Sequence, residues 1–456
     1  MPCRQDHGGI DVTAMKKHII ALALIALLIV GGAFLYFARG DTAQLAPGAD
    51  VGKEPVFTTP RNELIPTVNI AELEGWKAGE KPVAAKGLSV SRFVDGLTHP
   101  RSMLRLPNGD ILVAETNSPP RPQSGIVNRI MSYMMDKAGA GVPSPNRITL
   151  LRDTDGDGRA DTKTAFLTGL NSPYGMALIG DTLYVANTDA LMAFRYKEGE
   201  TKITEKGRKL LNLPAQAPNY HWTKSLTVSP EGLLYVGIGS NSNIGEGGLD
   251  NEKNRAAVLE VNPKTGEYRI FASGLRNPTG LAFEPDSGAL WGVVNERDML
   301  GSDLVPDFLT RVEFGGFYGW PWNYWGGYED RRVQPQRPEI REYTKRPDYA
   351  LGNHVAPLGL SFAKDMKLGA PFTNGAFVGL HGSWNRKPAA GYKVVFISFQ
   401  NNGEVGTAKP VDVLTGFLDK NGKAHGRPVD VTSDSKGALL VSDDVGGVIW
   451  RVVKAD

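Results

Sequence analysis

Residues 221–243 read HWTKSLTVSPEGLLYVGIGSNSN, and this stretch decides the fold. Two runs of alternating apolar side chains, 225–228 and 233–238, flank Pro230-Glu231-Gly232, where proline presets φ and glycine permits a tight turn. The pattern predicts a β-hairpin. Because antiparallel strands bring the start of the first strand and the end of the second to one edge, we expect His221 beside the loop 239–243. That edge is where we expect the chemistry.

The same hairpin pattern occurs six times along the chain. Each copy opens on an alternating run, passes through a turn signal and ends on a second apolar run. The copies cover residues 100–115, 173–187, 221–238, 278–296, 357–381 and 428–443. Repeats at roughly 50–90 residues, each a short run of strands, are typical of the blades of a β-propeller. The sequence therefore predicts an all-β, six-bladed β-propeller.

Composition agrees with a large, turn-rich β domain. The chain has 456 residues, of which 41% are hydrophobic, and it contains 54 glycines and 30 prolines. A formal net charge of +2 argues against a nucleic-acid partner, because such proteins are usually strongly basic.

The N-terminal part carries a membrane signal. Residues 19–37 form an uninterrupted apolar run, which follows Met15-Lys16-Lys17 and is long enough to cross a bilayer as a helix. We expect residues 1–40 to hold a cytoplasmic tail and a transmembrane helix, favouring a retained anchor over a cleaved signal peptide, with Met15 as an alternative start. The rest of the chain is expected outside the cytoplasm, in the periplasm. The single cysteine, Cys3, leaves that exported part without a disulfide.

The remaining boundaries follow from periodicity. Residues 41–86 have little periodicity and are predicted to form a linker with a short helix at 70–76. Residues 87–456 form the propeller. The alternating runs 89–94 and 448–453 are expected to close it by sharing one blade.

Residues 152–161 read RDTDGDGRAD and resemble part of a calcium loop. Its carboxylates are Asp153, Asp155, Asp157 and Asp161, but the glutamate expected at the twelfth position is Thr164. Two interpretations stay open, a structural calcium site and an acidic turn on a solvated surface.

Cations and histidines gather at the edge that carries His221. Five histidines fall before a first strand or after a second strand of a hairpin: His99, His221, His354, His381 and His425. The basic residues on or near this edge are Arg101, Lys224, Arg276, Arg297, Arg386 and Arg427, and the neutral hydrogen-bonding groups include Asn241 and Asn243. Converging cations in a nearly neutral protein favour a small polyanionic ligand. The aromatic stretch 314–328 suits stacking on a ligand or packing between blades, and packing is the commoner use.

An ordered string of motifs resembles the soluble quinoprotein sugar dehydrogenases, above all their sorbosone-dehydrogenase-like branch. The motifs are HWTKSLTVSPEGLLYVGIGSNSN, GLRNPTGLAFEPDSGALW, VNERDMLGSDLVPD and GGFYGWPW. The resemblance implies a propeller that binds pyrroloquinoline quinone (PQQ) and Ca²⁺ and oxidises a hydroxyl or hydrated aldehyde carbon of a sugar. The carboxylates of PQQ would account for the cationic edge.

The resemblance also implies roles for particular residues. His221 matches the catalytic base, while Arg427 and Arg386 match cofactor-binding cations. The cofactor calcium would be held by backbone carbonyls near Arg297 and Asp298. Better-known members have an Arg-Asn pair where this chain has Asn243-Ile244, so we expect other groups to contact the cofactor, namely Lys224, Arg297, Asn241 and Asn243.

Two other functions remain open. A calcium-dependent lactonase would need ligands converging on an axial metal, and the residues at second-strand ends that offer them are Glu115, Asn187, Asn241 and Glu296. A non-catalytic propeller that binds a sugar or a protein would need none of this chemistry. For the dehydrogenase, the sequence implies an electron acceptor in the membrane or periplasm and does not fix the sugar.

Overall fold

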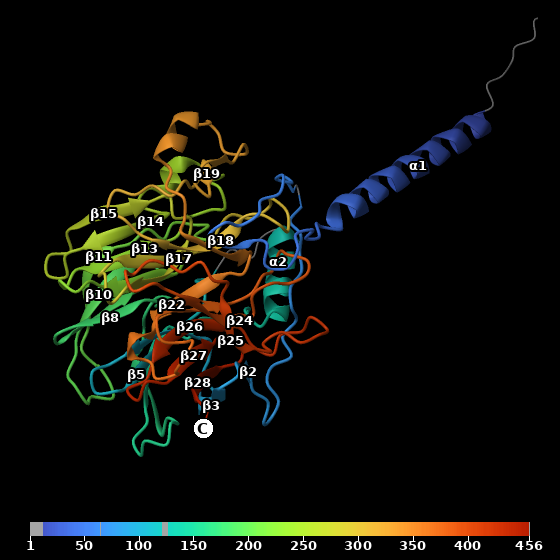
Figure 1. Cartoon of the computed structure of the whole chain (residues 1–456). Helices are drawn as coiled ribbons and strands as arrows, with labels where there is room; N and C mark the ends of the chain where they lie inside the picture. Colours follow the sequence, from blue (N-terminus) through green and yellow to red (C-terminus); the bar gives the residue numbers. More distant parts are fainter. Residues whose placement is uncertain (1–11, 64, 121–125, 456) are drawn as a thin grey trace, which may run out of the picture.

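Six antiparallel sheets surround a central axis in the computed structural model, which describes residues 12–63, 65–120 and 126–455 (Figure 1). The predicted six-bladed β-propeller is confirmed. The first blade consists of β4 (Pro100–Arg105), β5 (Ile111–Glu115), β6 (Arg147–Arg152) and β7 (Thr162–Leu167). The second consists of β8 (Met176–Ile179), β9 (Thr182–Ala186), β10 (Ala190–Arg195) and β11 (Arg208–Asn212). The third consists of β12 (Lys224–Val228), β13 (Leu234–Ile238), β14 (Ala257–Val261) and β15 (Tyr268–Ser273).

The other three blades each include a strand from the N-terminal part of the chain. The fourth blade consists of β16 (Pro278–Phe283), β17 (Leu290–Val294), β18 (Pro306–Arg311) and β21 (Tyr349–Asn353), with β1 (Val51–Gly52) at its edge. The fifth consists of β22 (Pro357–Phe362), β23 (Gly375–Leu380), β24 (Lys393–Ser398) and β25 (Val411–Thr415), with β2 (Val83–Ala84) at its edge. The sixth consists of β26 (Pro428–Ser433), β27 (Leu439–Asp443) and β28 (Val448–Lys454), with β3 (Leu88–Val94) at its edge.

The hairpin around residues 221–243 forms as predicted. β12 pairs with β13 in the register Lys224↔Ile238 to Val228↔Leu234. The start of β12 and the end of β13 therefore share one edge of the propeller, which we call the mouth edge. The turns between first and second strands lie at the opposite edge.

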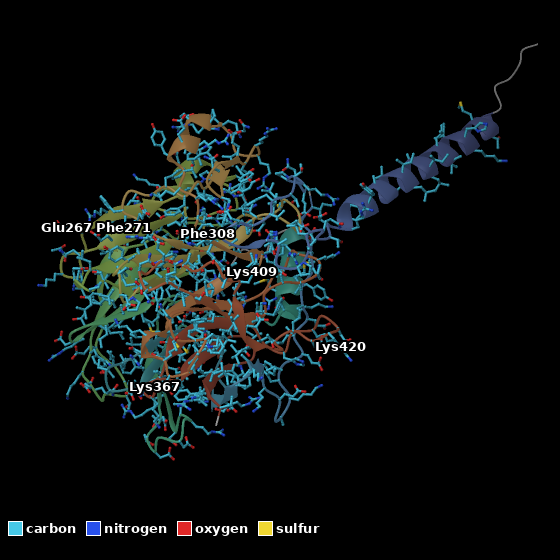
Figure 2. The ribbon with its side chains drawn as sticks, viewed as in Figure 1. Glu267, Phe271, Phe308, Lys367, Lys409 and Lys420 are labelled. Carbon is cyan, nitrogen blue, oxygen red and sulfur yellow. The ribbon has the colours of Figure 1, made fainter. Side chains whose placement is uncertain are left out.

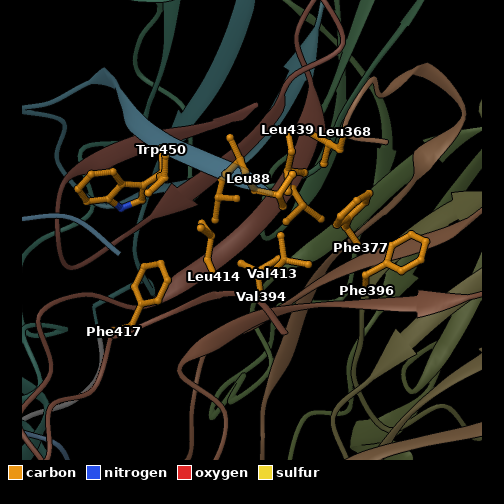
Figure 3. Packing of buried hydrophobic residues seen from close by; sticks show 14 of the residues in the cluster. Leu88, Leu368, Phe377, Val394, Phe396, Val413, Leu414, Phe417, Leu439 and Trp450 are labelled. Carbon is orange, nitrogen blue, oxygen red and sulfur yellow. The ribbon is translucent and has the colours of Figure 1, made fainter. Parts of the chain in front are cut away.

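Burial explains why second strands are so apolar. Every residue of β5, β13, β17, β23 and β27 is buried, because both faces of these strands pack against neighbouring blades. Figure 3 shows one of these interfaces, where Trp450, Leu439 and Val413 belong to a single apolar cluster. Burial of apolar surface at about 25 cal/mol per Å² is the main force that holds the blades together.

The ends of the propeller close on each other. β28 pairs with β3 antiparallel, with Trp450 opposite Arg92 and Ile449 opposite Val94. This confirms the predicted closure, in which strands from the start and the end of the domain complete one blade.

Residues 41–86 are a strap packed along the propeller, so the prediction of a linker with a helix at 70–76 is wrong in its secondary structure. Within the described part of this segment there is no helix. Leu73 instead bridges Ala424, and the Glu74 N–H donates to the Ala424 carbonyl at 2.8 Å. The Trp76 indole donates to Asp443 at 2.7 Å. Pairing with a distant loop satisfies backbone groups that a helix would otherwise satisfy internally.

Two helices lie outside the blades. α1 (Val12–Ala38) contains one window, Met15–Phe34, that is long and apolar enough to cross a membrane, with mean hydropathy 2.2 and no burial. It suits a signal peptide or an anchor equally by length and composition. α2 (Ile126–Lys137) follows β5 at the mouth edge.

Candidate active site

The mouth edge assembles side chains from all blades around the axis. A cavity of about 670 Å³ runs between the first strands towards the opposite edge, and its lining includes Tyr174, Ser225 and Asp430 but not His221, Arg101 or Arg427. At the mouth edge, the Arg101 guanidinium lies 5.8 Å from the ring centroids of both Tyr174 and Trp222. Since Trp222 follows His221 in the chain, this contact brings the third blade next to the first.

His221 is held in one ring orientation by Ser240. Its Nδ1 lies 2.9 Å from the Ser240 carbonyl oxygen and 2.9 Å from the Ser240 hydroxyl oxygen. That hydroxyl donates its own proton to the Ser242 carbonyl at 2.6 Å, so it accepts from the ring. Both partners of Nδ1 are acceptors, which places the proton of the neutral imidazole on Nδ1 and the lone pair on Nε2. A lone pair at Nε2 is what a general base needs.

Lys224 lies beneath this segment and is fully buried. Its ammonium donates to the Trp222 carbonyl at 3.1 Å. Burial, with a smaller contribution from the Arg255 charge, lowers the pKa of Lys224 well below its usual value. The structure thus places this predicted cofactor-binding residue inside the protein, where it supports the backbone next to His221.

A buried carboxylate, Asp444, binds two side chains of the mouth edge. Arg101 donates to it at 2.7 Å, and the His381 Nε2–H points at both of its oxygens at 3.0 and 3.1 Å. Against the effect of burial, the His381 ring and the Arg101 guanidinium hold the pKa of Asp444 well below its usual range. Burial lowers the pKa of His381 to about 4, although Asp444 opposes the shift. The pair is therefore a carboxylate beside a neutral imidazole at neutral pH.

Arg427 is a buried cation at the mouth edge. Only 6% of it is exposed, and its guanidinium donates to the Tyr392 hydroxyl at 2.7 Å. Among the residues that the structure describes, no carboxylate forms an ion pair with it, and its Nε has no hydrogen-bond partner. Arginine stays charged in proteins, and a buried charge without a counter-ion is costly. An anionic ligand at the mouth would remove that cost.

The other two predicted arginines are engaged by the protein. Arg386 donates from Nε to the Ser302 carbonyl at 3.0 Å and from a terminal nitrogen to the Pro388 carbonyl. Arg297 is fully buried, and it donates to the carboxylates and carbonyl oxygens of Glu296, Asp330, Pro321 and Asn323. Both side chains tie mouth-edge loops together in this structure.

The two predicted asparagines also bind neighbouring loops. Asn241 accepts the Asn219 backbone N–H at 2.8 Å and so fixes the residues before His221. The Asn243 side-chain oxygen accepts from Arg276 and from the Asp298 N–H, both at 2.9 Å. These contacts orient the rim of the mouth.

The segment around Asp298 joins three blades. Its carboxylate accepts from Arg276 at 2.9 Å and from Asn385 at 2.8 Å. Its carbonyl oxygen accepts from Asn243 and Arg332, so a calcium ion at that atom would have to displace two donors. In the described part of the chain no hydrogen bond reaches the Arg297 carbonyl oxygen.

The acidic loop that resembles a calcium site lies at the opposite edge, between β6 and β7. Ligand atoms of Asp153, Asp155 and Asp161 lie within 4.8 Å of one another, and Asp157 is outside this group. The Lys436 ammonium is 3.5 Å from Asp153. The loop is thus separated from His221 by the length of the blades.

Glu115, one of the ligands that a lactonase would use, already has protein partners. Glu115 is buried and accepts from Arg147, Thr149 and the Thr98 N–H. Among the described residues, the three aspartates of the opposite edge are the only acidic, histidine or cysteine side chains that place three ligand atoms within 4.8 Å of one another. The geometry therefore gives no support to an axial metal held by side chains at the mouth.

Asp444, Tyr392 and Ser240 contribute to the site, although the sequence did not single out their roles. The tandem Asp443-Asp444 at the end of a predicted second strand was a usable signal. The 343-residue separation between Asp444 and Arg101 hid the contact.

Fold and mouth together define a propeller with His221 and several buried cations at one edge. The TrAA12-like family model matches residues 82–307 and 336–455, and the chain belongs to this family.

Two relatives of this chain are named as quinone-dependent sugar dehydrogenases. The pyrroloquinoline quinone-dependent pyranose dehydrogenase of Coprinopsis cinerea is 24% identical over 428 residues, which is 81% of this chain and 54% of that protein. The pyrroloquinoline quinone-dependent sugar dehydrogenase of Hypocrea jecorina is 24% identical over 423 residues, 81% of this chain and 88% of that protein. The chain thus spans about half the length of the Coprinopsis relative.

A solved structure shares the fold. The holo form of the pyranose dehydrogenase PQQ domain from Coprinopsis cinerea superposes with a TM-score of 0.65 at 21% identity, and covers 84% of this chain and all of that domain.

Proposed function

We propose that this protein is a PQQ-dependent dehydrogenase that oxidises a CH–OH group of a sugar, with His221 as the general base. The names of its relatives support oxidation of a sugar by a quinone cofactor. The observation that carries the assignment of the base is the arrangement of His221, whose Nδ1 faces two oxygen acceptors.

The mouth fits an anionic cofactor. The Nε atoms of Arg101 and Arg427 are buried there and have no hydrogen-bond partner among the described residues. PQQ carries carboxylates, and charge-assisted hydrogen bonds from arginine are the strong kind. Arg427 and Arg101 would hold these carboxylates, and Tyr392 and Asp444 would keep the two guanidinium groups in place. When bound, PQQ supplies the acceptor for the two electrons that leave the sugar carbon.

The chain's own part in the reaction is proton removal and charge stabilisation. His221 Nε2 takes the proton from the sugar hydroxyl, and the Ser240 oxygens stabilise the imidazolium that results. The cations around the axis stabilise negative charge that develops at the reacting oxygen.

Calcium belongs to the proposal as a partner of the cofactor. In the segment 295–298, the Arg297 carbonyl is the backbone oxygen that receives no hydrogen bond from the described residues, and the Glu296 Oε1 is a side-chain oxygen without a partner. Carbonyl and carboxylate oxygens are good ligands for Ca²⁺. A side-chain calcium site at Asp153, Asp155 and Asp161 would act at the far edge, as a structural element only.

Reconstitution tests the proposal. The purified chain is loaded with PQQ and Ca²⁺, and reduction of a soluble dye is followed with a panel of aldoses, sorbosone-like aldehydes and lactones. Sugar-dependent dye reduction that requires PQQ supports the proposal. Bound PQQ without turnover of any sugar would favour a non-catalytic binding propeller, and lactone hydrolysis without PQQ would favour a lactonase.

A further inference from the structure

The strap joins the propeller at the mouth edge within three residues of the end of α1. Asp41 accepts the Ser302 N–H at 2.8 Å, and its carbonyl oxygen accepts from the Ser302 hydroxyl at 3.1 Å. The Lys387 ammonium donates to the Arg39 carbonyl at 3.0 Å, while the Ala43 N–H donates to the Lys387 carbonyl at 2.7 Å. Two adjacent blades thus grip the chain where it leaves the helix.

The two loops that bind residues 39–43 belong to the mouth edge. Ser302 lies in the loop 295–305, which also carries Asp298, and Lys387 lies in the loop 381–392, which also carries His381. Arg386 locks the two loops together through the Ser302 carbonyl at 3.0 Å. The attachment point of α1 and the candidate active site are therefore parts of one hydrogen-bonded edge.

The length of chain between membrane and mouth is short. The apolar window of α1 ends at Phe34, the helix ends at Ala38, and the first propeller contacts come at Arg39 and Asp41. At helical and extended rises this path spans at most about 16 Å. Headgroups occupy about 5–7 Å of it on one side of a bilayer. The rim of the mouth would stand on the order of 10 Å from the membrane surface.

A second element on the same edge has interfacial character. α2 follows β5 at the mouth edge, and the strap that continues from α1 joins it where the Leu73 N–H donates to the Lys137 carbonyl. Tyr133 of α2 is 60% exposed, and the Lys137 ammonium lies 5.3 Å from its ring centroid. Tyrosine and lysine together are enriched where protein meets lipid headgroups.

We infer that α1, retained as an anchor, holds the mouth edge towards the bilayer, and that the electrons from the sugar pass to a lipid-soluble quinone dissolved in that bilayer. This inference rests on the proposed function. The sugar loses two electrons and two protons as its C–H and O–H bonds break and a C=O bond forms. The membrane quinone gains two electrons and two protons as both of its carbonyl groups become hydroxyl groups.

Two exposed lysines provide matched probes of the orientation. Lys420 lies in the loop 416–427 at the mouth edge, and Lys367 lies between β22 and β23 at the opposite edge, as Figure 2 shows. The full chain with Cys3→Ser receives either Lys420→Cys or Lys367→Cys, is labelled with a fluorophore and is placed in liposomes that contain quencher-labelled headgroups. We expect severalfold stronger quenching at position 420. Equal quenching, or stronger quenching at position 367, would overturn the inference.

Electron transfer provides an independent measurement. Liposomes that contain the PQQ-loaded full chain and a lipid-soluble quinone receive sugar outside, and quinol formation is compared with reduction of a soluble dye. A flexible insert of about 40 Gly and Ser residues between Ala38 and Arg39, with an r.m.s. span of about 35 Å, frees the orientation. We expect it to lower quinol formation severalfold and to leave dye reduction unchanged.

The outcomes distinguish a failure of the proposed function from a failure of the inference about membrane orientation and the quinone. No dye reduction in either form would contradict the proposed function. Normal dye reduction without quinol formation, or electron delivery only to a soluble redox protein, would overturn the inference and leave the proposed function standing. Release of α1 during maturation, seen as a shortened chain that leaves the membrane, would also overturn it.

Discussion

The two edges of this propeller differ in how they use charge. At the mouth edge, the buried Asp444 carboxylate has partners from two other blades, the Arg101 guanidinium and the neutral His381 ring, whose side chains are only 11% and 15% exposed. At the opposite edge, buried carboxylates such as Asp110 pair with a partly exposed arginine of the same blade, and other ion pairs lie in exposed turns. Asp286 and Lys364, for example, form a 3.4 Å ion pair with more than half of each side chain exposed. Buried, pre-positioned charge is costly to assemble and is therefore a mark of function. The difference points to the mouth edge as the place of catalysis.

The strongest way to break this comparison is to neutralise Asp444. Asp444→Asn leaves the Arg101 charge buried with a weaker partner, and breaking a buried pair costs about 3–5 kcal/mol. We expect a loss of this size in the free energy of unfolding, measured by denaturant titration. Asp286→Asn at the opposite edge is the matched control, and its effect should stay within about 0.5 kcal/mol. Equal effects of the two changes would remove the distinction between the edges.

The next largest effect concerns cofactor affinity. Arg427→Ala removes a charge-assisted contact worth about 1.5–3 kcal/mol, which corresponds to roughly one to two decades in affinity for PQQ. Titration of the quinone by fluorescence or calorimetry measures this. Arg386→Ala is the comparison, because the protein already engages that guanidinium. Unchanged quinone affinity in a folded Arg427→Ala variant would show that the anion binds elsewhere.

The pH dependence of stability sharpens the same comparison. His381 has a pKa lowered from 6.5 to about 4, so between these values the unfolded chain binds more protons than the folded chain. Stability therefore falls as pH drops through this window, by up to about 1.4 kcal/mol per pH unit from this group. Unfolding titrations between pH 7 and 4 measure the slope, and His381→Gln should reduce it. An unchanged slope would mean that His381 is not held neutral.

How far the sequence predicted the molecule depends on the range of the interactions. The six hairpins were predictable because turn residues and period-2 alternation act within a few residues. The blade closure was predictable because the two end strands had no other partner. The strap was mispredicted because Leu73 and Trp76 pair with Ala424 and Asp443, which are far away in the sequence. The residues next to Leu73 and Trp76 give no sign of these contacts.

The candidate site shows the same limit. His221 was found from its place before β12, a local feature. Arg297 and Lys224 lie near the same edge in sequence, yet both are fully buried. The buried Arg297 donates a hydrogen bond to the Asp330 carboxylate, and the buried Lys224 donates one to the Trp222 carbonyl. Whether a cation at a strand end faces a ligand or the protein depends on side chains that only the fold brings near.

The smallest expected effect is at the acidic loop of the opposite edge. Asp155 is exposed, so Asp155→Asn should change neither turnover nor PQQ affinity, and should change the free energy of unfolding by about 0.5 kcal/mol or less without Ca²⁺. Thermal unfolding with and without added Ca²⁺ tests for a structural ion at this loop. A loss of turnover would mean that the opposite edge is coupled to the reaction.

The most direct test of the central claim is the turnover of His221→Asn in the PQQ-loaded protein. Asparagine keeps a polar group of similar reach but has no basic lone pair, so quinone affinity should be retained. Turnover with sugar should fall by about 10²–10⁴, the usual contribution of a positioned general base. Near-normal turnover with the quinone bound would contradict the account, and the base would then have to be another residue of the mouth edge.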